Sequence, residues 1–487
     1  MTHTLLLILA QVSQASPVDL YGFGAANIGR GGGGVAIVED STAPMLNPAG
    51  LSFLDRPELL MGAGIVRMDF NDLPEVWWDT NLDGQLNEFD APLEVDPDPE
   101  PADGLTIAAS TPILDRYHVG ASLFVPTRQL TRFHTFDPSI PTYFQFKNRP
   151  HRFALAVAGS AELGQGISFG GGIRFLLKAP LHLGVTLSST VDGSVIEDAS
   201  VDDIVNVDVD IHDIDLRIEP DWVPIFGLRW DLEQLNPSLQ GLSLGLTGRG
   251  EGAMDIAITL DTQLNFHADN IGELSPTSMA VFISSYVRAL DHYLPAQLTG
   301  GIGWQPVDSL AVYADVQYTK WSGMVVNIAS IEDMLLDATL LDLSEVEVTD
   351  GNPNDLNFSD TLAIKAGIEI TLPEKRLSNG IGTVQITPRG GFGYEPTPLT
   401  SQTPDTALLD SDRLIYAVGV GLEHTFQFAG DMRSVVWDFY LQRQTLATGL
   451  FSRPTPEAPT EGYPVVDQGF SVGGSLITTG LQAGYRY

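Results

Sequence analysis

The chain has 487 residues and a formal net charge of −37, from 62 acidic and 25 basic side chains, and it contains no cysteine. The missing cysteines exclude disulfides, thiolate metal sites and cysteine nucleophiles. The acidic balance argues against nucleic acid as a partner, because affinity for phosphates comes from cations. The mean hydropathy of +0.06 is too low for a bundle of membrane helices. A transmembrane β-barrel fits this composition, since each of its strands is only half apolar.

Residues 1–15 read as a signal peptide, with a short apolar core and small residues, Ser13 and Ala15, before a predicted cleavage at Ser16. A buried N-terminal strand is the alternative. Residues 16–57 follow; they are rich in glycine and lack strand alternation. We expect this segment to form a hatch that plugs the lumen of a barrel, with a disordered leader as the alternative.

From residue 58 onward, apolar and polar residues alternate with the period of two that is typical of strands. The predicted strands are 58–70, 104–113, 118–125, 151–163, 167–177, 220–230, 242–264, 297–305, 310–321, 361–371, 383–394, 413–426, 434–444 and 469–487. Six short and seven long connections alternate between them, as in outer-membrane barrels. The sequence therefore predicts an all-β fold, a fourteen-stranded antiparallel transmembrane β-barrel over 58–487, with a few short helices in extracellular loops. Glycines inside these strands are expected where the contents of the lumen approach the wall closely.

The loop after the first strand contains a spacing typical of an EF-hand calcium loop. Its candidate ligands are Asp79, Asn81, Asp83, Gln85, Asn87 and Asp90, and Gly84 stands at the turn position. Pro74 and Pro92 flank the motif, so we expect an isolated extracellular loop that binds Ca²⁺ rather than a pair of helices. An acidic, solvated loop without metal is the alternative.

The loop 126–150 differs from its acidic neighbours because it combines cations with aromatic residues. The candidates for capturing a ligand are Arg128, Arg132, Phe133, Phe144, Phe146 and Lys147. Cations and rings together can hold the carboxylate and the tail of an amphiphile. Pairing of these cations with acidic loops or with lipopolysaccharide is the alternative.

The segment from Ser275 to Leu290 has apolar residues at helical spacing, including Phe282 and Tyr286. We expect an extracellular helix that either packs against other loops or lines a hydrophobic capture groove. Ile331, Leu335, Ala338 and Leu341 predict a second helix of this kind.

No motif predicts an enzyme. The pattern Gly-x-Ser-x-Gly occurs at 166–170, 241–245 and 469–473, in alternating strands rather than at the strand-to-helix turn of an esterase. None of the nine histidines belongs to a zinc-protease motif.

The last strand alternates and ends in Tyr485 and Tyr487, which is typical of the strand that the bacterial barrel-assembly machinery recognises.

The sequence resembles the FadL family of outer-membrane transporters for long-chain fatty acids and other hydrophobic compounds. The ordered matches are Gly29-Arg30-Gly31-Gly32 through Asn47-Pro48-Ala49-Gly50, Leu294-Pro295-Ala296 with Tyr313 to Trp321-Ser322, Arg389-Gly390-Gly391-Phe392-Gly393-Tyr394 with Asp410 to Arg413, and the aromatic C-terminus. The resemblance implies a monomeric, hatch-plugged barrel in the bacterial outer membrane. It also implies passive uptake of a hydrophobic molecule, with lateral exit into the membrane and the hatch residues Asn47, Pro48, Ala49 and Gly50 as the gate.

Two other functions remain open at this point: a non-transporting outer-membrane barrel, adhesive or structural, with calcium-braced loops, and a soluble calcium-binding β-protein.

The negative charge of the long loops affects which substrates can approach the barrel. The seven long loops together carry −33 of the −37 charges. Such a face suits contact with outer-membrane lipid and lipopolysaccharide bridged by divalent cations, but it repels fatty-acid anions over about 8–10 Å.

Overall fold

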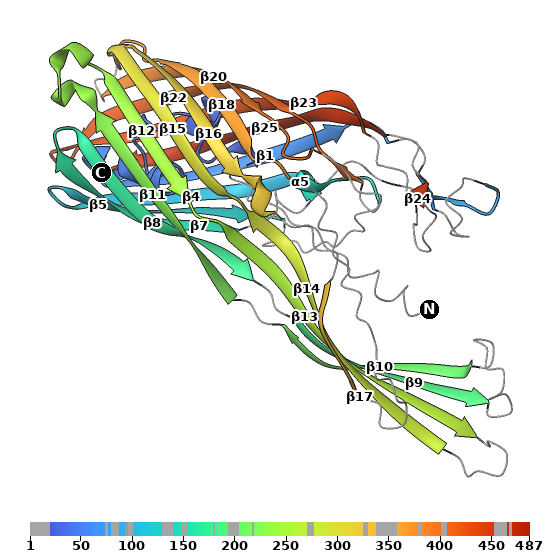
Figure 1. Cartoon of the computed structure of the whole chain (residues 1–487). Helices are drawn as coiled ribbons and strands as arrows, with labels where there is room; N and C mark the ends of the chain where they lie inside the picture. The colour runs from blue at the N-terminus through green and yellow to red at the C-terminus, as the bar shows by residue number, and fades with distance from the viewer. Residues whose placement is uncertain are drawn as a thin grey trace.

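Fourteen antiparallel strands close into a barrel (Figure 1). They are β1 (Glu58–Phe70), β4 (Ala102–Leu114), β5 (Tyr117–Pro126), β7 (Ala154–Gly164), β8 (Ile167–Lys178), β11 (Glu219–Asp231), β12 (Leu242–Arg249), β15 (Ala296–Val307), β16 (Leu310–Lys320), β18 (Thr361–Ile370), β20 (Thr383–Glu395), β22 (Arg413–Phe428), β23 (Asp431–Phe451) and β25 (Phe470–Arg486). The computed structural model describes residues 20–73, 76–78, 87–93, 95, 101–128, 140–147, 153–178, 181–192, 204–216, 219–269, 277–324, 330–337, 358–377, 382–400, 407–451, 465–466 and 470–487.

Two pairings complete the ring. The last strand, β25, pairs with the first along the whole length of β1, from Glu58 opposite Arg486 to Phe70 opposite Gly474. β18 pairs with β20, and the short strand β19 (Lys375–Arg376) extends the edge of β20. The predicted barrel is thus confirmed. One predicted strand, 242–264, is divided, because β12 ends at Arg249 and a new strand begins at Gly252.

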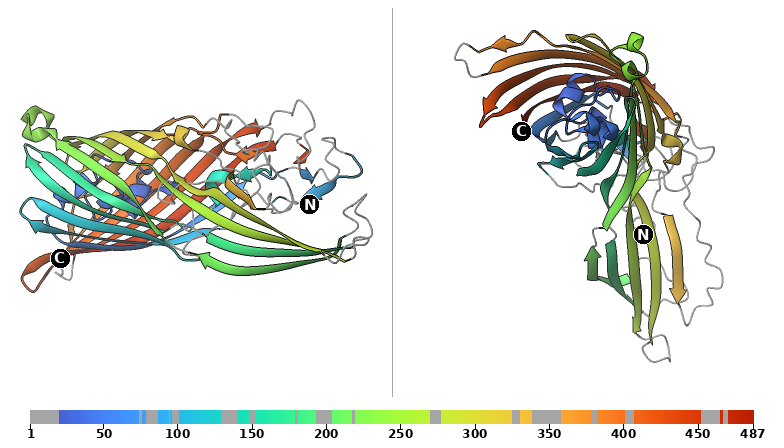
Figure 2. Two further views of the ribbon diagram at one scale, coloured as in Figure 1. Left: turned by 60° about the horizontal axis from the view of Figure 1, so that its bottom comes forward. Right: turned by 90° about the vertical axis from the view of Figure 1, so that its left-hand side faces the viewer.

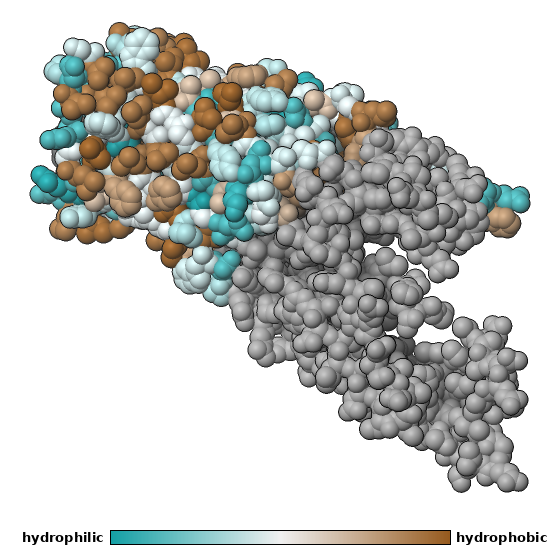
Figure 3. Space-filling view, in the orientation of Figure 1, coloured by the Kyte–Doolittle hydropathy of each residue, from teal (hydrophilic) through white to brown (hydrophobic). Residues whose placement is uncertain are grey.

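The barrel is apolar on the outside. On β12, Leu244 and Leu246 are 38% and 36% exposed, whereas the preceding residue, Ser243, is buried and donates to the Ala36 carbonyl oxygen of the hatch. Each of the fourteen barrel strands carries at least one exposed large apolar side chain, and Figure 3 shows much brown, hydrophobic surface on the face of the barrel turned to the viewer. Exposing such an apolar surface to water is unfavourable, so the exterior of the barrel suits an apolar medium. No helix among the described residues is long and apolar enough to cross a membrane.

Residues 20–57 lie inside the barrel, as the end-on view of Figure 2 shows. We call them the hatch; they contain the short helices α3 (Ala25–Gly29), α4 (Ala43–Leu46) and the 3₁₀ turn η2 (Pro48–Phe53). The hatch touches the wall where strand glycines leave room. A Cβ atom on Gly227 would lie 2.0 Å from Asn47 Oδ1, and one on Gly391 would lie 1.9 Å from the Arg30 carbonyl oxygen. These strand glycines therefore permit the close approach of the hatch.

The predicted helix over Ser275–Leu290 is wrong. This segment lies in the strand β14 (Thr277–Leu294), which pairs with β13 (Gly252–Asp269) in a separate five-stranded sheet beside the barrel. The other members of this sheet are β9 (Leu181–Asp192), β10 (Ile204–Leu216) and β17 (Ser330–Asp337). The second predicted helix, which included Ile331 and Leu335, is therefore also wrong, because both residues lie in β17. Figure 1 shows the sheet extending from the barrel.

The physical reason is the continuity of the hairpin. Arg249 pairs with Gln297 in the barrel, and Gly252 pairs with Leu294 in the sheet, which is the same register. The β12–β15 ladder thus continues directly into β13 and β14. A residue spacing that suits a helix is overridden when a long partner strand is already aligned, particularly for β-branched and aromatic residues.

The long loops at the same end of the barrel, from which the five-stranded sheet also arises, contain two small assemblies. β2 (Val76–Trp78), β3 (Ala91–Leu93) and β24 (Val465–Val466) form one sheet, and β6 (Thr142–Tyr143) pairs with β21 (Leu408–Leu409). The short helix α5 (Phe144–Lys147) follows β6. We refer to this end of the barrel as the loop end, and to the end with the six short connections as the short-turn end.

Candidate functional site

Asn47 fastens the hatch to the wall. Its side-chain nitrogen donates to the carbonyl oxygens of Val35, at 2.7 Å, and of Leu228 on β11, at 3.3 Å. Its side-chain oxygen accepts from the backbone N–H of Ala49 at 3.1 Å and caps the turn η2. All four predicted gate residues, Asn47, Pro48, Ala49 and Gly50, are buried. The asparagine therefore joins two parts of the hatch and the barrel at one point.

A chain of buried ion pairs forms a second attachment. Arg30 of the hatch pairs with Glu369 on β18, and Arg389 on β20 bonds the same carboxylate at 3.0 Å and also pairs with Asp438 on β23. Burial lowers the pKa of Arg30, but the Glu369 carboxylate more than offsets this, so the pKa is raised. The hydroxyl of Tyr313 donates to the Arg30 carbonyl oxygen. The hatch is thus held by a charged network that spans several strands.

Below the hatch, at the short-turn end, lies a cavity of about 590 Å³ that we call the vestibule. Its lining is dominated by charge, and Arg229 is typical because it pairs with Glu39 of the hatch at 2.9 Å and with Asp231 at 3.3 Å. Its other charged residues are Arg30, Asp40, Asp55, Arg56, Glu233, Asp308, Glu369, Arg389, Glu423, Asp438 and Arg486. A hydrophobic molecule would gain nothing by entering it.

Above the hatch, toward the loop end, one side of the lumen is filled by an apolar cluster. It joins the start of the hatch to the inner wall and to the segment around α5; its members include Leu20, Tyr21, Phe23, Met45, Val66, Met68, Phe70, Phe124, Tyr143, Phe146, Leu409 and Leu476. The Phe70 ring stacks on Tyr143 at 4.2 Å and lies 5.1 Å from Phe146. We call it the upper apolar cluster.

The structure brings only part of the predicted capture set together. Phe144 and Phe146 are fully buried, Phe146 in the upper apolar cluster and Phe144 at 5.7 Å from Phe358. Arg128 instead pairs with Asp103 at the rim, at 2.7 Å.

Of the remaining capture candidates, Arg132 and Phe133 lie outside the described residues, and only the backbone of Lys147 is described. Phe282 and Tyr286 lie on β14, opposite Gln263 and Thr259 of β13. They cannot line a helical groove, because the segment is a strand. A capture role for the loop cations stays a prediction.

Asp410 anchors α5 to the wall just before β22 begins. It is buried, and its Oδ2 accepts from Gln145 Nε2 and from Thr397 Oγ1, both at 2.6 Å. Burial raises the pKa of this carboxyl above its ordinary value, although Arg413 and these donors oppose the shift. The segment around α5 is therefore held by hydrogen bonds to one buried carboxyl group.

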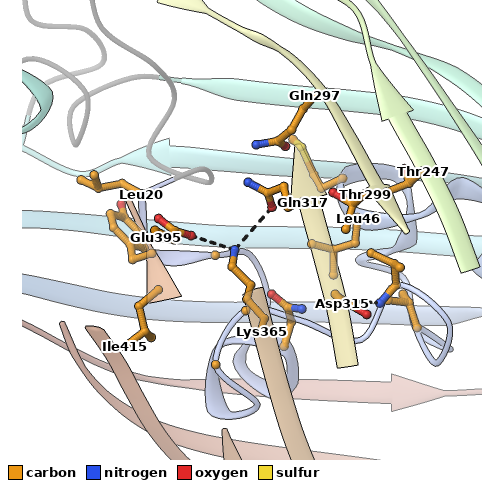
Figure 4. A pocket seen from close by; sticks show the side chains of 18 of the residues that line it. Leu20, Leu46, Thr247, Gln297, Thr299, Asp315, Gln317, Lys365, Glu395 and Ile415 are labelled. Atoms are coloured by element: carbon orange, nitrogen blue, oxygen red, sulfur yellow. Dashed lines mark hydrogen bonds and ion pairs between the residues drawn. The ribbon is translucent and has the colours of Figure 1, made fainter. Parts of the chain in front are cut away.

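Between hatch and wall lies a smaller cavity of about 90 Å³, the central cavity, shown in Figure 4. Lys365 projects into it, pairing with Glu395 at 2.9 Å and donating to Gln317 Oε1 at 3.5 Å. Glu395 also pairs with Arg413 at 2.7 Å. Sequence analysis missed Gln317, Lys365 and Glu395; strand alternation placed them on the wall, but no short motif marks residues that meet from separate strands.

The predicted calcium loop is described only at its end. Asn87 and Asp90 are seen, and the Asn87 backbone N–H donates to Asp90 Oδ2 at 2.6 Å. Asp79, Asn81, Asp83 and Gln85 lie outside the described residues. Within the described part of the chain, no group of three or more acidic or histidine side chains is arranged to hold a metal ion. Calcium binding therefore stays a prediction.

Comparisons with known proteins support the fold. No family model and no curated protein matches the sequence. Among solved structures, a FadL homologue from Pseudomonas aeruginosa matches 95% of this chain and 98% of its own, with 17% identity and a TM-score of 0.54. The fold is that of this FadL homologue. The toluene transporters TodX of Pseudomonas putida and TbuX of Ralstonia pickettii each match 96% of this chain and 99% of their own, at 14% and 16% identity and TM-scores of 0.47 and 0.46.

Proposed function

We propose that the protein is an outer-membrane transporter for passive, gated uptake of hydrophobic small molecules, with long-chain fatty acids as the class that the sequence resemblance implies. The apolar exterior on all fourteen strands supports a place in a membrane and argues against the soluble alternative. The barrel with a hatch in its lumen supports transport rather than catalysis. No covalent step is proposed.

The arrangement of the lumen carries the proposal. The hatch separates the upper apolar cluster from the charged vestibule. A hydrophobic molecule that enters from the loop end finds apolar partners above the hatch and a lining rich in charged groups below it. Leaving through the wall into lipid costs such a molecule less than crossing the vestibule. We therefore propose lateral exit, with the short-turn end facing the periplasm.

Movement of the hatch is the proposed gate, and Asn47 is its fastening. Cells that carry Asn47→Ala or Pro48→Ala, with wild-type amounts of barrel at the surface, are tested for uptake of a labelled long-chain fatty acid and of labelled toluene. We expect altered uptake of the transported compound, because Asn47 makes one hydrogen bond to the wall, at Leu228, and two within the hatch, at Val35 and Ala49. Unchanged uptake in both variants would remove these residues as the gate.

A second function is favoured by one observation. The central cavity is lined by Thr247, Gln297, Thr299, Gln317 and Lys365 as well as apolar residues, so this cavity is not a purely apolar passage. This suits a non-transporting barrel whose extracellular loops, braced by calcium, bind a partner. This alternative is selected if cells with and without the intact protein take up hydrophobic compounds equally and if the protein mediates adhesion that requires calcium.

A further inference from the structure

The five-stranded sheet beside the barrel has two chemically different faces. Because successive residues of a strand belong to opposite faces, the even-numbered and odd-numbered residues of β13 lie on different sides of the sheet. The even-numbered side carries Ile256, Ile258, Leu260, Leu264 and Phe266. The odd-numbered side carries Asp255, Thr259, Asp261, Gln263 and Asn265. We call these sides the apolar face and the acidic face of the sheet.

The neighbouring strands continue both faces. The parallel register with β13 places four residues of β9 on the apolar face: Leu181, Leu183, Val185 and Leu187. On β10, Val209 and Ile211 pair with two of these residues and join the same face, whereas Asp208 and Asp210 join the acidic face. The separation of apolar from acidic residues therefore extends over three strands.

Three irregularities in the pairing keep charged residues off the apolar face. Each occurs at an acidic residue that has no partner in the register: Asp213 of β10, Asp291 of β14 and Glu332 of β17. A shift of one residue moves the following residues to the opposite face. Without these shifts, Asp213, Glu332 and Arg288 would fall on the apolar face. Arg288 instead pairs with Ala257 on the acidic face, so the backbone register maintains the apolar face.

The apolar face of the sheet continues the outer face of the barrel. The β12–β15 ladder runs into β13 and β14 without a change of register. On β12, the exposed apolar residues Leu244 and Leu246 are even-numbered, as are the residues of β13 on the apolar face. The side of the wall that is exposed and apolar on the barrel is therefore the side that is apolar on the sheet.

The sheet begins within the depth of the membrane. β12 has eight residues, whereas a transmembrane strand needs about 9–11 residues to cross the hydrocarbon core. The first residues of β13 and their partners on β14 therefore complete the crossing on this side of the barrel. The start of the apolar face lies at the level of the outer leaflet.

The sheet also leaves the barrel in the direction that turns its apolar face toward lipid. In the end-on view of Figure 2 it lies beside the ring of barrel strands rather than across the mouth of the lumen. A wall that bends outward at the membrane surface turns its outer face onto that surface. The apolar face then meets lipid and the acidic face meets water, whereas an inward bend would expose the apolar face to water at a cost in free energy.

From these observations we infer that the five-stranded sheet is a lipid-binding platform, and that its apolar face lies on the acyl chains of the outer leaflet beside the barrel. The partner is a lipid surface rather than a protein, because the face is continuous with the surface that the barrel presents to lipid. This interaction goes beyond the proposed transport and depends only on the location of the barrel in the outer membrane.

The test uses spin labels, which the absence of cysteine allows to be placed one at a time. The labelled variants alternate between the two faces of β13: Ile258→Cys, Thr259→Cys, Leu260→Cys and Asp261→Cys. Folded, heat-modifiable protein is labelled with a nitroxide and reconstituted in vesicles of palmitoyl-oleoyl phosphatidylcholine. Power saturation in electron paramagnetic resonance compares collisions with oxygen, which concentrates in lipid, and with a nickel chelate, which stays in water. Leu246→Cys on the barrel exterior is the lipid-exposed reference.

We expect the ratio of oxygen to nickel collisions at Ile258→Cys and Leu260→Cys to match Leu246→Cys and to exceed the ratio at Thr259→Cys and Asp261→Cys several-fold. Low collision with both reagents at the first two sites would mean that protein, a second copy or another segment of this chain, covers the face, and would overturn the inference. Frequent nickel collision there would mean that the face meets water and would overturn it too. A Leu246→Cys label that meets mainly nickel would instead refute the membrane location of the barrel, and the inference with it.

Discussion

Gly227→Ala should release the hatch from the wall. The added Cβ would lie 2.0 Å from Asn47 Oδ1 and 3.0 Å from both the Ala49 nitrogen and Pro48 Cδ. Two of these neighbours are backbone or proline ring atoms that cannot rotate away. Overpacking of this kind costs about 1–3 kcal/mol, and displacing Asn47 weakens three hydrogen bonds at about 0.5–1.5 kcal/mol each.

A total of roughly 2–5 kcal/mol follows if about half of the hydrogen bonding survives. It changes the ratio of docked to undocked hatch by about 30-fold to 4,000-fold, because each 1.4 kcal/mol is tenfold. Gly227 lies on β11, and this strand keeps its pairing with β8 and β12, so the barrel should still assemble. The damage is confined to the plug.

The assay is single-channel conductance in planar bilayers, with limited proteolysis of the hatch as a second measurement. Gly227→Ala should conduct ions in long openings and expose the hatch to protease. Gly300→Ala is the control, because a Cβ there meets no atom closer than 4.0 Å. If Gly227→Ala stays as silent as Gly300→Ala, the hatch does not depend on this contact and the reasoning is refuted.

Three further predictions follow from other parts of the molecule. Calcium at millimolar concentration should protect the loop that contains Asp83 from protease or raise the melting temperature, and no change in either would contradict the calcium loop. Arg389→Met leaves Asp438 buried without its charge partner and should destabilise the barrel by roughly 3–5 kcal/mol, seen as a lower temperature for loss of the fast-migrating folded form in gels; Arg67→Met, at an exposed position, should leave that temperature unchanged. The raised pKa of Asp410 favours its protonated form in the folded protein. Its contribution to stability is therefore present at low pH and lost as the pH rises through the folded pKa, so Asp410→Asn should flatten the dependence of that gel transition on pH, and an unaltered profile would count against the assignment.

Strand prediction succeeded because the signal is local. A barrel wall places one side chain in lipid and the next in the lumen, so alternation along ten residues identifies the strand and its two faces. The predicted spans 58–70 and 167–177 agree with β1 and β8 to within one residue. The helix over Ser275–Leu290 failed because its spacing also fits a strand, and only the aligned partner β13 decides between them.

The candidate site was predicted in part. The glycine-rich segment and Asn47 could be singled out because glycine and asparagine in that order match a known hatch, and the loop aromatics Phe144 and Phe146 were found by composition. The cavity groups Lys365, Glu395 and Gln444 could not be found in this way. Each is one polar residue on the lumen side of a strand, like many others.

The sequence by itself determined the number of barrel strands, the apolar exterior and the concentration of negative charge in the long loops, since each depends on residues close together in the chain. Tertiary structure alone decided what fills the lumen. Arg30 meets Glu369, Asn47 meets Leu228 and Gln444 meets Leu20, across hundreds of residues of sequence. Closing the ring brings these groups together, because every barrel strand turns one face toward the same narrow interior, where the hatch must satisfy polar groups from all sides.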